Sequence, residues 1–482
     1  METANLTDSN DVNGGSSKLA QLFRRQHEAF LAAGAPGLDE RLDDLRKLRR
    51  AIQRDTARIA ELICADFGNR SRHESLLADI WPVLSAIRHT TKNLPRWMKP
   101  KRVPVGLELS WGHARIVYQP LGVVGIISPW NYPFQLAMEP LISALAAGNR
   151  VMLKPSELTP STSEFLAEFL AELFPPDKVT TVLGDAQVGA DFSRLPFDHL
   201  FYTGSTAVGQ LVMQAAATNL TPVTLELGGK SPCIVGEDAR LPDAARAILY
   251  GKLLSAGQTC IAPDYVLLHE RHLEEFIELA ADAVKKLYPS LKNNPDYTSI
   301  VNERHYQRIV QLIEEAKSKC ARVIELTQAQ NEPLSGDRKI PPTLVVQPDD
   351  ELALMREEVF GPVLPVKTYR RLGEAIDYVN CRPRPLALYY FGENKGDRDE
   401  VLRKTISGDV SINNTLMHIA VNDLPFGGIG ASGIGSYHGE FGFQTFSHRK
   451  GVFVQHRLNS TVLLRPPYGR MAEFILKLLL RR

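Results

Sequence analysis

Residues 123–154 read VVGIISPWNYPFQLAMEPLISALAAGNRVMLK, and their pattern decides the fold. An apolar run at 123–127 precedes a helical segment at 134–147, and a second apolar run follows at 150–153. Apolar runs that alternate with helical segments are typical of a parallel sheet with helices on both faces. The sequence therefore predicts an α/β fold built on a parallel sheet.

The same alternation continues downstream and places loops where such sheets bind ligands. Further helical segments lie at 161–174 and 206–217, and further apolar runs lie at 179–183 and 199–202. In an open parallel sheet, ligands bind at the carboxyl ends of the strands. Functional residues are therefore expected in the loops that follow the apolar runs.

One of these loops, Gly204-Ser-Thr-Ala-Val-Gly209, follows an apolar run and opens a helix. Backbone N–H groups and the helix dipole favour a phosphate at such a position. A P-loop would require Lys and then Ser or Thr after Gly209, where Gln210 and Leu211 stand, and this turn also lacks the spacing Gly-x-Gly-x-x-Gly. An ordinary helix start is the alternative interpretation of the turn.

Length and composition limit the class of protein. The 482 residues are too many for one hydrophobic core, so two or three domains are expected. Lys and Arg number 56 against 55 Asp and Glu, a balance that gives no overall field to attract nucleic acid. The five cysteines are scattered without metal-binding or disulfide spacing, which indicates a reducing, cytoplasmic compartment and no metal site.

Cys260 is the candidate nucleophile, in the stretch Leu253-Leu-Ser-Ala-Gly-Gln-Thr-Cys-Ile-Ala-Pro-Asp-Tyr265. Gly257 and Gln258 interrupt an apolar helical run just before it, so backbone N–H groups there can point at the carbonyl that the sulfur attacks. For a single cysteine, an inert buried side chain is the commoner alternative.

Glu226 is the candidate base, in the stretch Thr224-Leu-Glu-Leu-Gly-Gly-Lys-Ser231. A carboxylate between leucines is expected to be desolvated, and desolvation raises its pKa toward that of a general base working near pH 7. Pairing with Lys230 at the end of a strand is the alternative. A nucleophile and a base together indicate an enzyme more specifically than either does alone.

Cys260 and Glu226 in these settings resemble the aldehyde dehydrogenase superfamily, and the likeness extends through most of the chain. The Gly204 turn matches that family's version of the phosphate turn. Cys260-Ile-Ala-Pro-Asp-Tyr265 and Tyr437-His-Gly439 resemble its class-three branch, which includes fatty, benzaldehyde-type and coniferyl aldehyde dehydrogenases. The resemblance implies NAD(P)-dependent oxidation of an aldehyde to the acid. Its substrate would be an aromatic or coniferyl-type aldehyde, or a medium-to-long aliphatic one.

The resemblance also implies roles for individual residues. Asn131, in Pro129-Trp-Asn-Tyr-Pro-Phe134, would donate its amide to the oxyanion beside the N–H of Cys260. Cys260 would form a thiohemiacetal and then a thioester, and Glu226 would deprotonate the water that hydrolyses it. Two members of the implied cofactor-binding set, Lys154 and Glu157, would hold the adenosine ribose hydroxyls, which favours NAD although some relatives accept NADP. The full set is Trp130, Lys154, Glu157, Gly204, Ser205, Gly209, Glu358 and Phe360.

The family likeness implies a Rossmann-like cofactor domain, a second α/β catalytic domain and strands that bridge two subunits of a homodimer. The expected segments are a disordered lead-in (1–17), a helical part of the cofactor domain (18–106), a bridging hairpin (107–119), a dinucleotide-binding domain (120–228), a catalytic domain (229–417), a substrate loop with a bridging strand (418–465) and an amphipathic tail (466–482). The tail is apolar and basic but too short to span a membrane. It is expected to lie on a membrane surface, or else to pack on the partner subunit or fray.

Two other functions stay open at this point. A coenzyme-A-acylating dehydrogenase would use the same cysteine but pass the acyl group to a thiol, and the presence of Glu226 favours hydrolysis instead. A membrane-associated relative without catalysis would use the tail as its working part. The intact set of Cys260, Glu226 and Asn131 argues against that second alternative.

Overall fold

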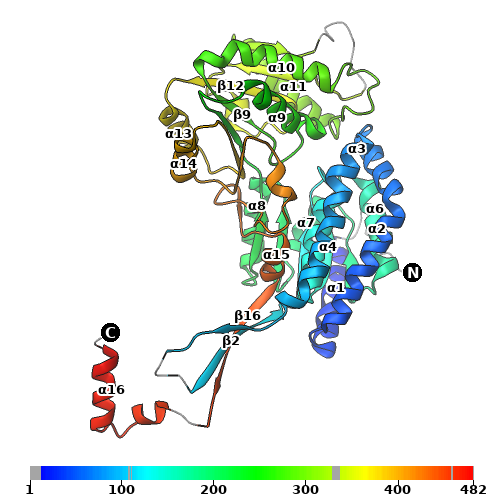
Figure 1. Ribbon diagram of the computed structural model, residues 1–482. Coiled ribbons are helices and arrows are strands. Elements are labelled where there is room, and N and C mark those ends of the chain that lie inside the picture. The colour runs from blue at the N-terminus through cyan, green and yellow to red at the C-terminus, as the bar shows by residue number, and fades with distance from the viewer. Residues whose placement is uncertain (1–11, 107–108, 110, 328–336, 458–459, 481–482) are drawn as a thin grey trace.

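Two sheets organise the computed structural model, which describes residues 12–106, 109, 111–327, 337–457 and 460–480 (Figure 1). The first sheet has the strand order β15-β7-β6-β3-β4-β5. Its strands are β3 (Val123–Ile127), β4 (Arg150–Lys154), β5 (Val179–Thr181), β6 (His199–Thr203), β7 (Val223–Glu226) and β15 (Gly433–Ile434). Strands β3 to β7 run parallel, and β15 is antiparallel at the edge. The predicted α/β fold is confirmed.

Helices cover this sheet where the sequence predicts them. They are α5 (Gln135–Ala147), α6 (Pro160–Leu173), α7 (Ala186–Ser193) and α8 (Thr206–Ala217). Every residue of α5 is buried, as expected for a helix that is apolar on all sides. The helix therefore anchors the loop 128–134, which joins it to β3.

The second sheet has the strand order β10-β11-β12-β9-β8-β13-β14 and is parallel except for β10. Its strands are β8 (Pro232–Val235), β9 (Tyr265–His269), β10 (Arg322–Glu325), β11 (Thr343–Val346), β12 (Val363–Tyr369), β13 (Ala387–Phe391) and β14 (Asp409–Ile412). Its helices are α9 (Leu241–Leu253), α10 (Leu273–Leu287), α11 (Glu303–Ser318), α12 (Ala353–Arg356), α13 (Leu372–Asn380) and α14 (Lys395–Lys404). The chain passes from the first sheet to the second between β7 and β8.

The N-terminal helices pack beside the first sheet (Figure 1). They are α1 (Val12–Ala33), α2 (Leu38–Phe67), α3 (Arg72–Glu74), a π-helical segment (Ser75–Ile80) and α4 (Trp81–Trp97). The predicted disordered lead-in is wrong for residues 12–17, which form the start of α1. Once a helix has formed, each further residue that joins it adds one hydrogen bond, so extension is much easier than nucleation. Residues 1–11 lie outside the described residues. Pro95 does not end α4, because it stands in the last turn of the helix, which continues to Trp97.

A three-stranded arm projects from the body and carries the C-terminal helix at its far end (Figure 1). The arm consists of β1 (Lys101–Val103), β2 (Gly112–Pro120) and β16 (Ser447–Gln455), and the tail helix is α16 (Arg470–Leu480). Strand β2 pairs antiparallel with β16 along its whole length and with β1 over Ala114–Ile116. Of the hairpin predicted at 107–119, residues 107, 108 and 110 lie outside the described residues.

Among the described residues, none of the helices combines the length and the apolar character that crossing a bilayer requires.

Candidate active site

A left-handed turn carries Cys260. Helix α9 ends at Leu253, and Ser255, Ala256 and Gly257 follow with φ angles of 53°, 50° and 78°. A left-handed backbone is uncommon for residues other than glycine and is retained where the surroundings determine it. A Cβ at Gly257 would overlap the main chain of Gly361, so only glycine fits there. The predicted break before Cys260 is thus a tight turn whose conformation is fixed by the residues around it.

Glu226 lies at the end of β7 and is only 3% exposed. Within the described part of the chain, neither of its carboxylate oxygens has a hydrogen-bond partner. Burial, and then the charge of Asp409, raises the pKa of Glu226 well above its usual range. Lys230 pairs with Asp264 and not with Glu226, so the alternative of a simple surface pair for Glu226 is wrong.

The charge of the Glu226 carboxylate acts on the thiol of Cys260. Burial, and then the charges of Glu358 and Glu226, raise the pKa of Cys260 to about 12, against the N–H groups of Cys260 and Ile261. The buried Tyr437 also has its pKa raised by burial and then by the charges of Glu139, Glu226 and Cys260. The sulfur and the base, which come from the two different sheets, therefore share one site.

The Asn131 loop lies against the turn that carries the sulfur. Asn131 is 4% exposed, and its Nδ2 donates to the main-chain oxygen of Gln258 at 3.1 Å. The next residue, Tyr132, places its Oη 2.6 Å from Oγ1 of Thr259. Because Thr259 precedes Cys260 directly, these contacts bring the Asn131 amide to the neighbourhood of the sulfur.

The loops after β3, β4 and β6 adjoin one another because those three strands are neighbours in the sheet. In the loop after β4, Lys154 Nζ donates to Glu157 Oε2 at 2.7 Å. In the turn after β6, Ser205 caps α8 by accepting the N–H of Val208. A Cβ at Gly204 or Gly209 would overlap the side chain of Tyr202 or Leu227, so glycine allows the turn to pack closely against these residues. The turn lies at the N-terminus of α8, where backbone N–H groups can bind a phosphate.

Glu358 and Phe360 lie on the other side of the site. The carboxylate of Glu358 occupies the space that a Cβ at Gly228 would fill, and its pKa is raised to about 8 by burial and by Asp264. The Phe360 ring stands edge-on to the Trp130 ring, with centroids 5.4 Å apart. The structure therefore brings members of the predicted cofactor set from both sheets to the site.

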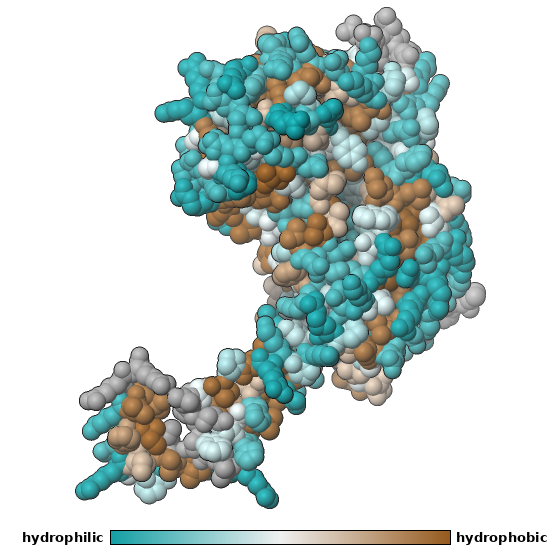
Figure 2. All heavy atoms as spheres, viewed as in Figure 1, coloured by the Kyte–Doolittle hydropathy of each residue, from teal (hydrophilic) through white to brown (hydrophobic). Residues whose placement is uncertain are grey.

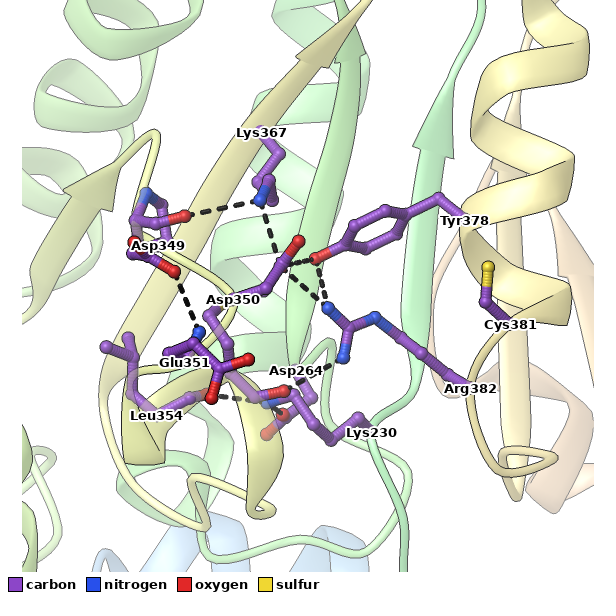
Figure 3. A network of polar contacts seen from close by, with 12 residues as sticks. Lys230, Asp264, Asp349, Asp350, Glu351, Leu354, Lys367, Tyr378, Cys381 and Arg382 are labelled. Atoms are coloured by element: carbon purple, nitrogen blue, oxygen red, sulfur yellow. Dashed lines mark hydrogen bonds and ion pairs between the residues drawn. The ribbon is translucent and has the colours of Figure 1, made fainter.

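A polar network fixes the segment that leads to Glu358 (Figure 3). Lys230 Nζ pairs with Asp264 and donates to the main-chain oxygens of Leu354 and Glu357 at 2.7 and 3.0 Å. Asp264 Oδ1 accepts the N–H of Val359 at 3.0 Å. A second cluster, around Asp350, joins the same segment to Lys367, Tyr378 and Arg382 (Figure 3).

Sequence reasoning missed two charged residues of this region. Lys252 is 1% exposed, its Nζ lies 4.0 Å from Asp264, and burial lowers its pKa to about 8. Its place between apolar residues at the end of α9 was a usable signal, because a lysine is rarely fully buried. Asp409, at the start of β14, has a buried oxygen without a partner among the described residues, and its local sequence gives no such signal.

Comparison with known proteins gives the class of enzyme. A sequence model described as the aldehyde dehydrogenase family matches residues 12–452. The chain belongs to the aldehyde dehydrogenase family. The predicted resemblance is confirmed, and this aldehyde dehydrogenase is an NAD(P)-dependent enzyme that oxidises an aldehyde.

Similar proteins cover nearly all of the dehydrogenase. A probable coniferyl aldehyde dehydrogenase of Pseudomonas aeruginosa is 49% identical over 96% of this chain and 97% of its own length. Aldehyde dehydrogenase family 3 member A2 of Macaca fascicularis is 41% identical over 90% of this chain and 87% of its own. The substrate-bound structure of AldH from Staphylococcus aureus is 39% identical, with a TM-score of 0.90 over 95% of this chain and 99% of that one.

The residues of the dehydrogenase fit a nicotinamide dinucleotide. The Gly204 turn at the start of α8 can offer N–H groups to a pyrophosphate, and Lys154 and Glu157 can offer polar groups to a ribose. A structure of PnpE in complex with nicotinamide adenine dinucleotide is 25% identical to this chain, with a TM-score of 0.83 over 92% of it and 91% of PnpE. The enzyme of that complex therefore shares this fold.

Proposed function

We propose that this dehydrogenase oxidises a coniferyl-type aldehyde to its acid, with Cys260 as nucleophile, Glu226 as base and Asn131 as oxyanion donor. The observation that carries the proposal is the effect of a buried carboxylate, without a hydrogen-bond partner among the described residues, on a cysteine that follows a left-handed turn and belongs to the other sheet's domain. We assign residues 120–228 to dinucleotide binding and 229–417 to catalysis. The predicted cytoplasmic location stays a prediction.

The acylation half begins with transfer of the Cys260 thiol proton to solvent water and addition of Sγ to the carbonyl carbon. The oxyanion that forms would accept hydrogen bonds from the Asn131 amide and from the N–H of Cys260. Release of hydride from that carbon leaves an acyl thioester on Cys260. A dinucleotide bound by Lys154, Glu157 and the Gly204 turn would supply the hydride acceptor.

Glu226 acts as the base in the deacylation half of the reaction. Its raised pKa suits a base that takes a proton from water near neutral pH. The hydroxide attacks the thioester carbonyl, the C–S bond breaks, and the acid and the Cys260 thiolate are released. The buried position of Glu226 supports hydrolysis over transfer to a thiol such as coenzyme A, because that transfer needs no water-activating base.

The proposed substrate class rests on the similar proteins, of which two at 49% identity carry the name coniferyl aldehyde dehydrogenase. A panel of coniferaldehyde, benzaldehyde and aliphatic aldehydes of increasing length, ranked by kcat/KM with NAD, tests it. Coniferaldehyde is expected to rank first. A higher value for long aliphatic aldehydes would move the assignment to fatty aldehydes, a class that the sequence also allows.

Asp409→Asn should move the acidic limb of the pH–kcat profile to lower pH. The charge of Asp409 raises the pKa of Glu226, so its removal lowers the pH at which Glu226 becomes an active base. Asp409 itself has its pKa raised to about 6 by burial, against the N–H of Gly427 and the charge of His438. Profiles of both enzymes between about pH 5 and 9 measure the shift.

Asp397→Asn is the matched control, since Asp397 lies on α14 and its carboxyl is not among the charges that shift the pKa of Glu226. Its profile should overlay that of the unchanged enzyme. If the acidic limb of the pH–kcat profile stays in place in Asp409→Asn, the pKa of the base that controls kcat does not depend on the charge of Asp409.

The arm and the tail supply the proposed dimer interface. Apolar side chains gather on α16 and along the arm (Figure 2), and in α16 only Ala472 is buried. The large exposed apolar side chains of the arm and of α16 are Val103, Phe453, Val454, Met471, Phe474, Leu476, Leu478 and Leu480. A single subunit rarely leaves so much apolar surface in water. A second copy that packs on the arm and tail would cover it.

Liposome flotation of the full chain and of a chain ending at Pro467 tests the tail. Both should partition equally with anionic vesicles if α16 packs on a partner subunit, and light scattering should show the full chain as a dimer. Flotation of the full chain alone would instead identify α16 as an interfacial membrane anchor, with Arg470 and Lys477 near the headgroups.

A further inference from the structure

Arg70 is a charged residue outside every motif of the proposed site, yet it is 1% exposed. Its Nη2 donates to Asp79 Oδ2 at 2.9 Å, and its Nη1 donates to the main-chain oxygen of Asn131. Asp79 is fully buried as well. Because desolvation of the two ions offsets much of their attraction, such a pair is weak support for stability alone. The geometry of the Arg70–Asp79 pair indicates a role in positioning neighbouring residues.

The Arg70–Asp79 pair holds the Asn131 loop at several points. Arg70 Cζ lies 4.7 Å from the centre of the Tyr132 ring. Asp79 Oδ1 accepts the N–H of Gln135 at 3.2 Å, at the start of α5. A guanidinium supplies several donors in one rigid plane, which allows it to bind a carboxylate and a carbonyl at once while it stacks on an aromatic ring.

The same segment holds the other side of the site. Glu74 Oε1 accepts the N–H of Ser255 at 3.1 Å, and its Oε2 accepts from Oγ1 of Thr298 at 2.6 Å. Ser255 is the first left-handed residue of the turn that leads to Cys260. Residues 70–79 therefore fix both the turn that carries the sulfur and the loop that carries the amide.

We infer that Arg70 is a positioning residue: by binding the Asn131 main chain it sets where the Asn131 amide stands relative to the sulfur of Cys260. The inference rests on the proposed function, in which that amide stabilises the oxyanion. Arg70 touches neither sulfur nor amide and acts through the loop. Misplacement of a catalytic group by about 1 Å can lower a rate on the order of 10²-fold.

A double-mutant cycle in kcat/KM for the aldehyde tests the inference. Asn131→Ala alone should lower kcat/KM by about 10²- to 10³-fold, the usual loss of one oxyanion donor. Arg70→Lys keeps a positive charge opposite Asp79 but lacks the planar second donor, and should lower kcat/KM by about 10- to 10²-fold. Added to Asn131→Ala, Arg70→Lys should change kcat/KM by less than about twofold, since the amide that it positions is gone.

Asp79→Asn removes the negative charge of the Arg70–Asp79 pair and should show the same non-additivity with Asn131→Ala. Arg338→Lys is the matched control, because the hydrogen bonds of Arg338 go to the main-chain oxygens of Phe67, Ile300 and Val301, at 2.7, 2.9 and 3.3 Å, rather than to the Asn131 loop. Its effect should be equal in both backgrounds. NADH affinity, measured by fluorescence, and the thermal unfolding midpoint identify the variants that are folded.

Two results would overturn the inference, and they differ. Equal losses from Arg70→Lys with and without Asn131 would reduce Arg70 to a general support of the fold. A normal kcat/KM for Asn131→Ala alone would remove the oxyanion role of the amide, and with it the proposed function of that residue. The inference would be supported if Arg70→Lys and Asp79→Asn were both non-additive with Asn131→Ala while Arg338→Lys was additive with it.

Discussion

Cys260→Ala should abolish aldehyde-dependent formation of NADH, with a loss on the order of 10⁶-fold, as for removal of a nucleophile in other covalent enzymes. Alanine has no atom that can bond to the carbonyl carbon, so no thiohemiacetal forms and hydride has no carbon from which to leave. Absorbance of NADH at saturating coniferaldehyde and NAD measures the rate.

The variant should still bind NADH, because the Gly204 turn and the Lys154–Glu157 pair belong to the first sheet and remain unchanged. Cys381→Ala is the matched control, since Cys381 is an exposed cysteine at the end of α13 and its loss should leave the rate intact. Retained reduction of NAD by Cys260→Ala would place the nucleophile elsewhere.

Glu226→Gln should release about one NADH per active site in a burst and then stall, with kcat lowered by about 10²- to 10⁴-fold. The amide has the shape of the carboxyl group but cannot take a proton from water, so the thioester persists. Acylation should survive, because loss of the Glu226 charge lowers rather than raises the pKa of Cys260. Stopped-flow absorbance separates the burst from the steady state.

Hydroxylamine provides the control for this second result. Its nitrogen attacks the thioester carbonyl without a general base, the C–S bond breaks, and a hydroxamic acid leaves with the thiolate regenerated. Turnover of Glu226→Gln should therefore recover with added hydroxylamine, and the hydroxamate should accumulate. An unchanged steady state without hydroxylamine would show that another group activates the water.

The helices and strands near the site could be predicted closely because their signals are local. Helix α8 and strand β3 have the predicted bounds, Thr206–Ala217 and Val123–Ile127. A buried element produces an apolar run of its own length, and a polar turn residue marks its end. Pro95 shows the limit of such signals. A proline usually ends a helix, but α4 continues past Pro95 to Trp97.

The amino-acid sequence by itself determined the α/β fold and the family, and it predicted Cys260 and Glu226 as the sulfur and the base, since each rests on a short stretch of neighbouring residues. Only the tertiary structure decided which charges meet. Lys230 pairs with Asp264, Glu226 has no hydrogen-bond partner among the described residues and feels the charge of Asp409, and Arg70 lies against the Asn131 loop. Those contacts join residues far apart in the chain, and no local pattern encodes them, because they depend on how the two sheets and the N-terminal helices pack together.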